Sequence, residues 1–69
     1  MSDRVFKKIE LTGTSTQSVE EAIENAVDRA AKTVHNLRWF EVVETRGRID
    51  ENRVAEYQVT LKIGFALDS

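Results

Sequence analysis

The chain has 69 residues, a formal net charge of −2, no cysteine and one histidine. We expect residues 1–69 to form a single domain whose small core needs support, and because disulfides and thiolate or histidine-built metal sites are excluded, oligomerisation is the support that remains. The balanced charge, without a basic cluster or a long apolar run, argues against nucleic acid and against membrane association.

The first element predicted is a strand over residues 4–15, "RVFKKIELTGTS". Alternation places Val5, Ile9 and Leu11 on one face together with Lys7. Phe6 lies on the other face. Gly13 and the hydroxyl residues around it are expected to end the strand. Because "MSDRVFKKIE" contains no apolar signal segment, we expect a cytoplasmic location.

The strongest signal predicts a helix over residues 19–35. Ser18 and Glu21 have the spacing of a capping box, in which each side chain accepts a backbone N–H of the other residue. Eight apolar residues then recur at helical spacing, and four of them are alanine, so the helix is expected to approach its sheet closely. His35 falls at the end of this helix, where it is expected to cap backbone carbonyls.

Two alternating segments, residues 37–49 and 53–67, predict a β-hairpin. In the second segment the odd-numbered residues are apolar and should face the helix. If Arg48 pairs near Arg53 across a four-residue loop, Phe40 and Val42 join that apolar face, and Trp39 lies on the other side with Gln58. Trp39 and Gln58 would then lie on the order of 13 Å apart, so that only two chains together could place both on one small ring.

The fold class predicted is therefore α+β. We expect the order β-α-β-β, with a three-stranded antiparallel sheet and one helix packed on one of its faces. The other face carries Trp39 and Val43, and a half-apolar sheet face without a covering layer favours a partner.

The residues themselves leave the function open. No phosphate-binding glycine motif is present, and no nucleophile or acid–base set can be assembled, so we expect no enzyme activity. Trp39 is either an oligomer contact or a stacking platform for a planar ligand. The Gln58 amide either faces water or pairs with a ring edge. Arg46 and Arg48 are either solvated or form a polar clamp, and Arg29 and Lys32 fit a solvated helix face.

Three segments, in this order and spacing, resemble the dodecins: "KKIELTGTS", "AIENAVDRAAKTVHNLRWFEVVETRGRI" and "YQVTLKIGF". The resemblance implies a small β-α-β-β protein that assembles with itself into a hollow shell of twelve chains and binds flavin without being an enzyme. It implies that FMN or riboflavin stacks on Trp39 at subunit interfaces, with Gln58 bonded to the polar edge of the ring and Arg46 in the pocket. The implied role is flavin storage and suppression of its photochemistry.

Two further expectations follow from the resemblance. Some relatives also hold coenzyme A, for which Phe6, Lys7, Arg29 and Lys32 are the residues to consider. Many bacterial relatives have arginine beside the flavin pocket where this chain has Ala66, so we expect a weaker preference for FMN here. The alternative is a structural or coenzyme A-binding shell without flavin. No metal is implied.

Overall fold

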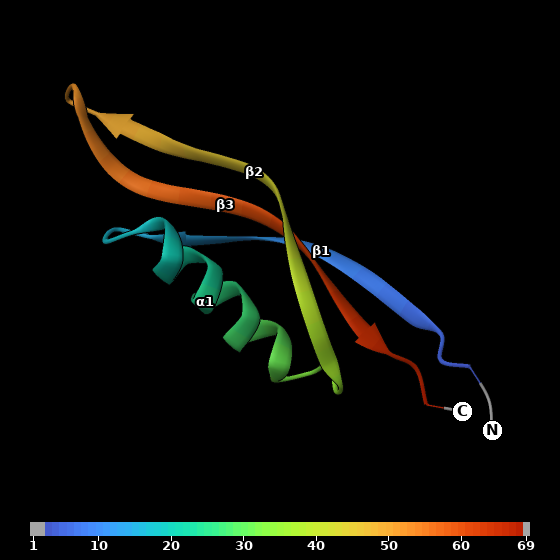
Figure 1. Ribbon diagram of the computed structural model, residues 1–69. Helices are drawn as coiled ribbons and strands as arrows, with labels where there is room; N and C mark the ends of the chain where they lie inside the picture. Colours follow the sequence, from blue (N-terminus) through green and yellow to red (C-terminus); the bar gives the residue numbers. More distant parts are fainter. Residues whose placement is uncertain (1–2, 69) are drawn as a thin grey trace.

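The computed structural model describes residues 3–68. Its elements are β1 (Phe6–Ser15), α1 (Val19–Ala31), β2 (Leu37–Asp50) and β3 (Arg53–Ala66). The strands form one antiparallel sheet in the order β1-β3-β2, and α1 lies along one face of it (Figure 1). The predicted α+β fold, with one helix on a three-stranded antiparallel sheet, is confirmed.

Strand β1 begins two residues later than the predicted range of 4–15 and ends at Ser15 as predicted, with Gly13 inside the strand. Gly13 lies on the helix side, paired with Val59 of β3. A Cβ at this position would overlap the carbonyl oxygen of Ala22 and crowd the Cβ of Ala26. The glycine therefore lets the helix backbone approach the sheet instead of breaking the strand.

Helix α1 starts where the sequence predicts and ends earlier. Ser18 Oγ accepts the backbone N–H of Glu21 at 3.0 Å, as a capping box requires. The carboxylate of Glu21 does not return to Ser18, however, but accepts the hydroxyl of Ser15 at 2.5 Å. The helix stops at Ala31 instead of His35, and its last carbonyls accept backbone N–H groups of residues 32–34, so His35 lies beyond the end that it was expected to cap.

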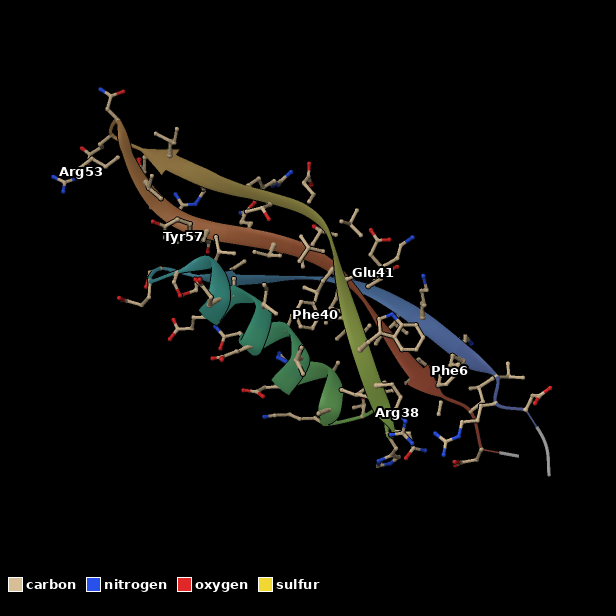
Figure 2. All side chains as sticks on the ribbon, viewed as in Figure 1. Phe6, Arg38, Phe40, Glu41, Arg53 and Tyr57 are labelled. Atoms are coloured by element: carbon tan, nitrogen blue, oxygen red, sulfur yellow. The ribbon has the colours of Figure 1, made fainter. Side chains whose placement is uncertain are left out.

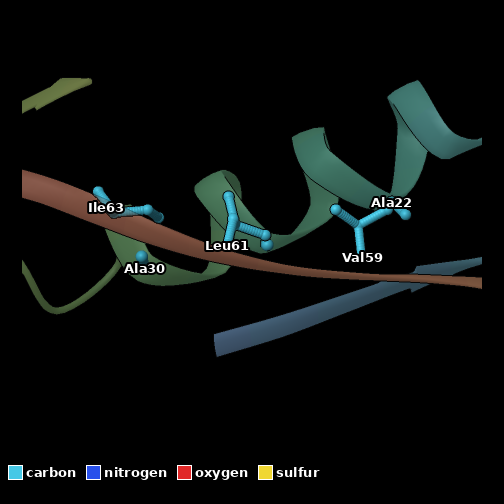
Figure 3. Close-up of a cluster of buried hydrophobic side chains, with 6 residues drawn as sticks. Ala22, Ala30, Val59, Leu61 and Ile63 are labelled. Atoms are coloured by element: carbon cyan, nitrogen blue, oxygen red, sulfur yellow. The ribbon is translucent and has the colours of Figure 1, made fainter. Parts of the chain in front are cut away.

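The core is small and consists of three alanines of α1 facing three aliphatic residues of β3. These six side chains are at most 6% exposed: Ala22, Ala26, Ala30, Val59, Leu61 and Ile63. Figure 3 shows Ala22 beside Val59 at one end of the helix and Ala30 beside Ile63 at the other. Small residues on the helix thus bring its axis close to β3, as the alanine-rich stripe predicts.

The β2–β3 hairpin closes differently from the prediction. Asp50 pairs with Arg53, so the turn has two residues and not four. These residues, Glu51 and Asn52, both have positive φ, at 52° and 63°. Two consecutive residues in the left-handed region are typical of a type I′ turn, whose twist matches that of the paired strands.

Three register shifts in the β2–β3 ladder change which side chains share a face. They lie between Leu37 and Trp39, between Val42 and Glu44, and between Arg48 and Ile49. Phe40 still pairs with Ile63 on the helix side, and Trp39 pairs with Gly64 on the opposite side, as predicted. Between the second and the third shift the alternation is reversed, and Arg46 therefore comes to the Trp39 side, opposite Gln58.

The helix packs mainly on β1 and β3 and leaves the helix side of β2 open. Phe40 and Val42 were expected beneath the helix, but they are 48% and 46% exposed. The molecule is long, 57 × 20 × 13 Å, and its radius of gyration is 14.4 Å, compared with about 11 Å for a compact chain of this length. This shape, with much of its apolar surface uncovered, is typical of a subunit that completes its packing with other chains.

Candidate functional site

The indole of Trp39 lies on the sheet face opposite the helix, at the end where both termini are found. A Cβ on its cross-strand partner Gly64 would overlap the six-membered ring of the indole, so the ring rests directly on the backbone of β3. The ring of Phe6 meets it edge-on, with centroids 5.2 Å apart and planes at 68°. Trp39 remains 38% exposed, which leaves a flat, positioned aromatic surface available to a planar ligand.

Arg46 and Gln58 form a second polar group farther along the same face. The Nε–H of Arg46 donates to Oε1 of Gln58 at 2.6 Å, and Nε2 of Gln58 donates to Oε1 of Glu56 at 2.9 Å. Arg48 lies 3.7 Å from that same carboxylate oxygen. The two bonds fix which end of the Gln58 amide is the donor and which is the acceptor, and each end keeps capacity for another bond.

The aromatic and polar groups are not adjacent within one chain. Trp39 pairs with Gly64, whereas Arg46 pairs with Gln58, six residues away along β3. At strand rise this is about 20 Å, farther than the 13 Å expected from sequence. The two-residue turn causes the difference, because it moves the pairing partner of Trp39 two residues farther along β3 than the four-residue loop would. We call these two groups of one chain, the Trp39 group and the Arg46–Gln58 group, its half-sites. A small planar ring can touch both kinds of half-site only if one of them comes from a second copy of the chain.

Ala66 lies near the aromatic group, opposite Phe6 in the β1–β3 ladder. It lines a hollow of about 560 Å³ at the end of the sheet, together with Arg4 and Arg38. The sequence analysis did not single out either arginine. Arg38 falls at the first register shift of β2, where simple alternation gives no information on its direction.

The four residues considered for coenzyme A do not form one group. Phe6 packs against Trp39 on the face away from the helix. Lys7 pairs with Phe65 and is on the helix side of the sheet. Arg29 lies in the last turn of α1, and Lys32 is its C-cap residue. The single chain thus separates Phe6 from the three cations.

An ion pair borders the aromatic group. Lys8 Nζ lies 2.7 Å from Oε1 of Glu41. This hydrogen bond is the main cause that lowers the pKa of Glu41 below its ordinary value of 4.5. Desolvation opposes it, and the positive charges of Lys8 and Lys62 lower the pKa further. Glu41 therefore stays ionised at neutral pH, and the face beside Trp39 carries fixed charges of both signs.

Two further observations apply to residues 3–68 only. No three acidic, histidine or cysteine side chains of this part of the chain gather where they could hold a metal ion. Its helix α1 is neither long nor apolar enough to cross a membrane.

Comparisons with known proteins agree with the fold and the order of the motifs. A protein-family model described as Dodecin matches residues 5–68. The chain is 54% identical over 65 residues to a protein named Dodecin from Thermus thermophilus, which covers 94% of each chain. It is 33% identical over 63 residues to Calcium dodecin from Mycobacterium tuberculosis, covering 91% of this chain and 89% of that protein. The solved dodecin of Streptomyces davaonensis has a TM-score of 0.94 at 46% identity, covering 99% of this chain and 100% of that one.

Proposed function

The chain belongs to the dodecin family, and from this we propose that it binds FMN or riboflavin for storage and is not an enzyme. The observation that carries the proposal is the indole of Trp39. It is supported from below by Gly64 and from the side by Phe6, yet it is 38% exposed on a face that its own helix does not cover. A tryptophan held in this way favours stacking of a flat heteroaromatic ring.

We further propose that the binding unit is formed between chains of a closed homo-oligomer, a hollow shell of twelve copies. The separation of Trp39 from Gln58 along β3 supports this, because one chain alone does not bring both to one ring. The exposed apolar side chains of β2, Phe40 and Val42 among them, supply surface for contacts between copies. A two-fold arrangement would bring the same half-sites together from both partners.

Within such a site each residue has a distinct role. Trp39 provides the stacking surface, worth about 0.5–1.5 kcal/mol beyond the burial of apolar area. Gln58 offers a donor and an acceptor to the polar edge of the ring, and Arg46 fixes the orientation of that amide through its 2.6 Å hydrogen bond. A bound flavin supplies a chromophore that is reactive when excited by light. Trp39 can donate an electron to the excited ring and so suppress its photochemistry.

The alternative proposals receive less support. A coenzyme A site built from Phe6, Lys7, Arg29 and Lys32 would need more than one chain, because the single chain separates these residues. A structural shell without flavin would use Trp39 only as a contact between chains, whereas a flat ring held by Gly64 and Phe6 favours stacking on a planar ligand. One relative is named Calcium dodecin, but we propose no calcium binding for this chain. A cytoplasmic location remains part of the proposal.

The direct test is to denature the protein purified from cells and to identify any released chromophore by mass spectrometry. We expect FMN or riboflavin, in a ratio of about one per chain. A colourless protein that also leaves the fluorescence of added riboflavin unchanged would support the structural shell instead. A released coenzyme A without flavin would support the second alternative.

A further inference from the structure

The hollow that Ala66 lines lies at the end of the sheet near the aromatic group. It has a volume of about 560 Å³ and is lined by Arg4 and Arg38 as well as by Asp3 and Asp68. Figure 2 places Arg38 and Phe6 at the same end of the molecule, near the chain termini, with Arg53 at the opposite end. Arg38 therefore lies at the end of the sheet that also carries the aromatic group.

Arg38 connects this hollow to Trp39. It also lines a neighbouring, mostly apolar hollow of about 190 Å³ together with Trp39 and Phe40. The register shift between Leu37 and Trp39 puts Arg38 outside the regular alternation. Within residues 3–68, it is the one residue that borders both hollows. Phe40 and Ile63 put this second hollow on the helix side of the sheet, whereas the indole lies on the other side. The anionic tail of a ligand stacked on Trp39 would therefore meet the guanidinium only where it reaches the end of the sheet.

The charges in the polar hollow leave Arg38 available to an anion. Asp68 accepts a hydrogen bond from Nδ2 of Asn36 at 3.1 Å. Among residues 3–68, neither Arg4 nor Arg38 makes an ion pair within 4.0 Å. A guanidinium is always charged at neutral pH and its planar set of donors matches the geometry of a phosphate.

We propose that Arg38 is a specificity-determining residue that binds the phosphate of FMN, so that the chain prefers FMN to riboflavin. This inference rests on the proposed function, and it changes one expectation from sequence. Ala66 removes the cation that many relatives have on β3, and a weaker preference for FMN was expected for that reason. Arg38, in the same hollow but on β2, returns a positive charge to that place.

The test compares FMN with riboflavin in fluorescence titrations at low salt. The wild-type chain should bind FMN about tenfold more tightly, as one charge-assisted phosphate contact would give. Arg38→Gln should remove most of this difference by weakening FMN alone. Arg53→Gln, which removes the same charge at the hairpin turn, should leave both affinities unchanged. Added salt should weaken FMN binding in the wild type and have little effect in Arg38→Gln.

A rescue variant and a milder variant make the result independent of folding defects. Ala66→Arg in the Arg38→Gln background should restore the preference for FMN by returning a cation to the hollow. If Arg38→Gln does not assemble, Arg38→Lys can be tested instead. It keeps the positive charge but not the planar guanidinium, and it should lower the affinity for FMN about threefold and leave the affinity for riboflavin unchanged. Inorganic phosphate added with riboflavin should not tighten riboflavin binding, since the phosphate contact depends on its attachment to the ring.

The outcomes separate the two proposals. Equal binding of FMN and riboflavin by the wild type, or an equal loss of both in Arg38→Gln, would overturn the role of Arg38 and leave flavin binding intact. If neither flavin binds the wild-type protein, the proposed function fails and the inference fails with it.

Discussion

Gly64→Ala tests whether the position of the Trp39 ring matters for ligand binding. The new methyl group would overlap three atoms of the six-membered ring of the indole. Gly64 has no positive φ, so its backbone accepts alanine without strain. The only obstacle is a side chain that is 38% exposed and can therefore swing toward solvent.

Because the ring can move, the cost of the added methyl group should appear in ligand binding and not in the free energy of unfolding. Holding the ring in place above an added methyl group would cost about 1–3 kcal/mol, as overpacking does. In the free protein the ring avoids most of this by moving, while alanine lowers the entropy of the unfolded chain by an amount worth about 0.4–1 kcal/mol. We therefore expect an almost unchanged free energy of unfolding and a flavin affinity reduced by a factor of roughly 5 to 150.

Gly13→Ala is the matched comparison, because it is the same substitution on the same sheet. Its methyl group would overlap the carbonyl oxygen of Ala22, which is helix backbone and cannot swing away. Denaturant unfolding at equal chain concentration should show a large loss of stability for Gly13→Ala and little for Gly64→Ala. Fluorescence titration with riboflavin should show the reverse: a large loss of affinity for Gly64→Ala and a small one for Gly13→Ala. A Gly64→Ala protein with wild-type flavin affinity, or one as unstable as Gly13→Ala, would refute this reasoning.

Three other predictions concern the polar half-site, the open face of β2 and the ion pair beside the ring. Gln58→Leu should weaken riboflavin binding by about 0.5–1.5 kcal/mol in the same titration without changing the mass of the assembly; unchanged affinity would remove Gln58 from the site. Phe40→Lys should reduce the assembly mass measured by analytical ultracentrifugation below that of the proposed shell, twelve times 7.9 kDa. Phe40 is 48% exposed in the single chain, and a charge there opposes burial between chains. The lowered pKa of Glu41 means that the stability it contributes is present above the pKa of an unfolded glutamate and is lost as pH falls through the folded value. An NMR titration should find this pKa below 4.5 and should find it raised in Lys8→Gln; an equal pKa in both proteins would count against the ion pair.

Local sequence signals predicted the elements and the start of the helix well. Ser18 marked the N-terminus of α1 because its hydroxyl accepts a free backbone N–H. The end was placed too late because Val34 continues the apolar stripe, and no glycine or proline follows to mark a stop. Gly13 was interpreted as a strand end, although its role depends on how closely α1 approaches, which only the packed structure shows.

The candidate site could be predicted only in part. Alternation correctly placed Trp39 and Gln58 on the face away from the helix. It would have placed Arg46 on the other face, and the two shifts that flank this segment, at Val42/Glu44 and Arg48/Ile49, bring it beside Gln58. Arg38 was missed for the same reason. A β-bulge changes the direction of a side chain without leaving a clear pattern in a single sequence, and the residue set was therefore obtained from the resemblance rather than from periodicity.

The central claim is that a flavin ring stacks on Trp39, and the most direct measurement is the fluorescence of riboflavin titrated with wild-type protein and with Trp39→Ala. We expect the wild-type protein to quench riboflavin at saturation, and Trp39→Ala, still assembled, to bind it much more weakly and to leave its fluorescence largely unchanged. Full binding and full quenching by Trp39→Ala would contradict the account.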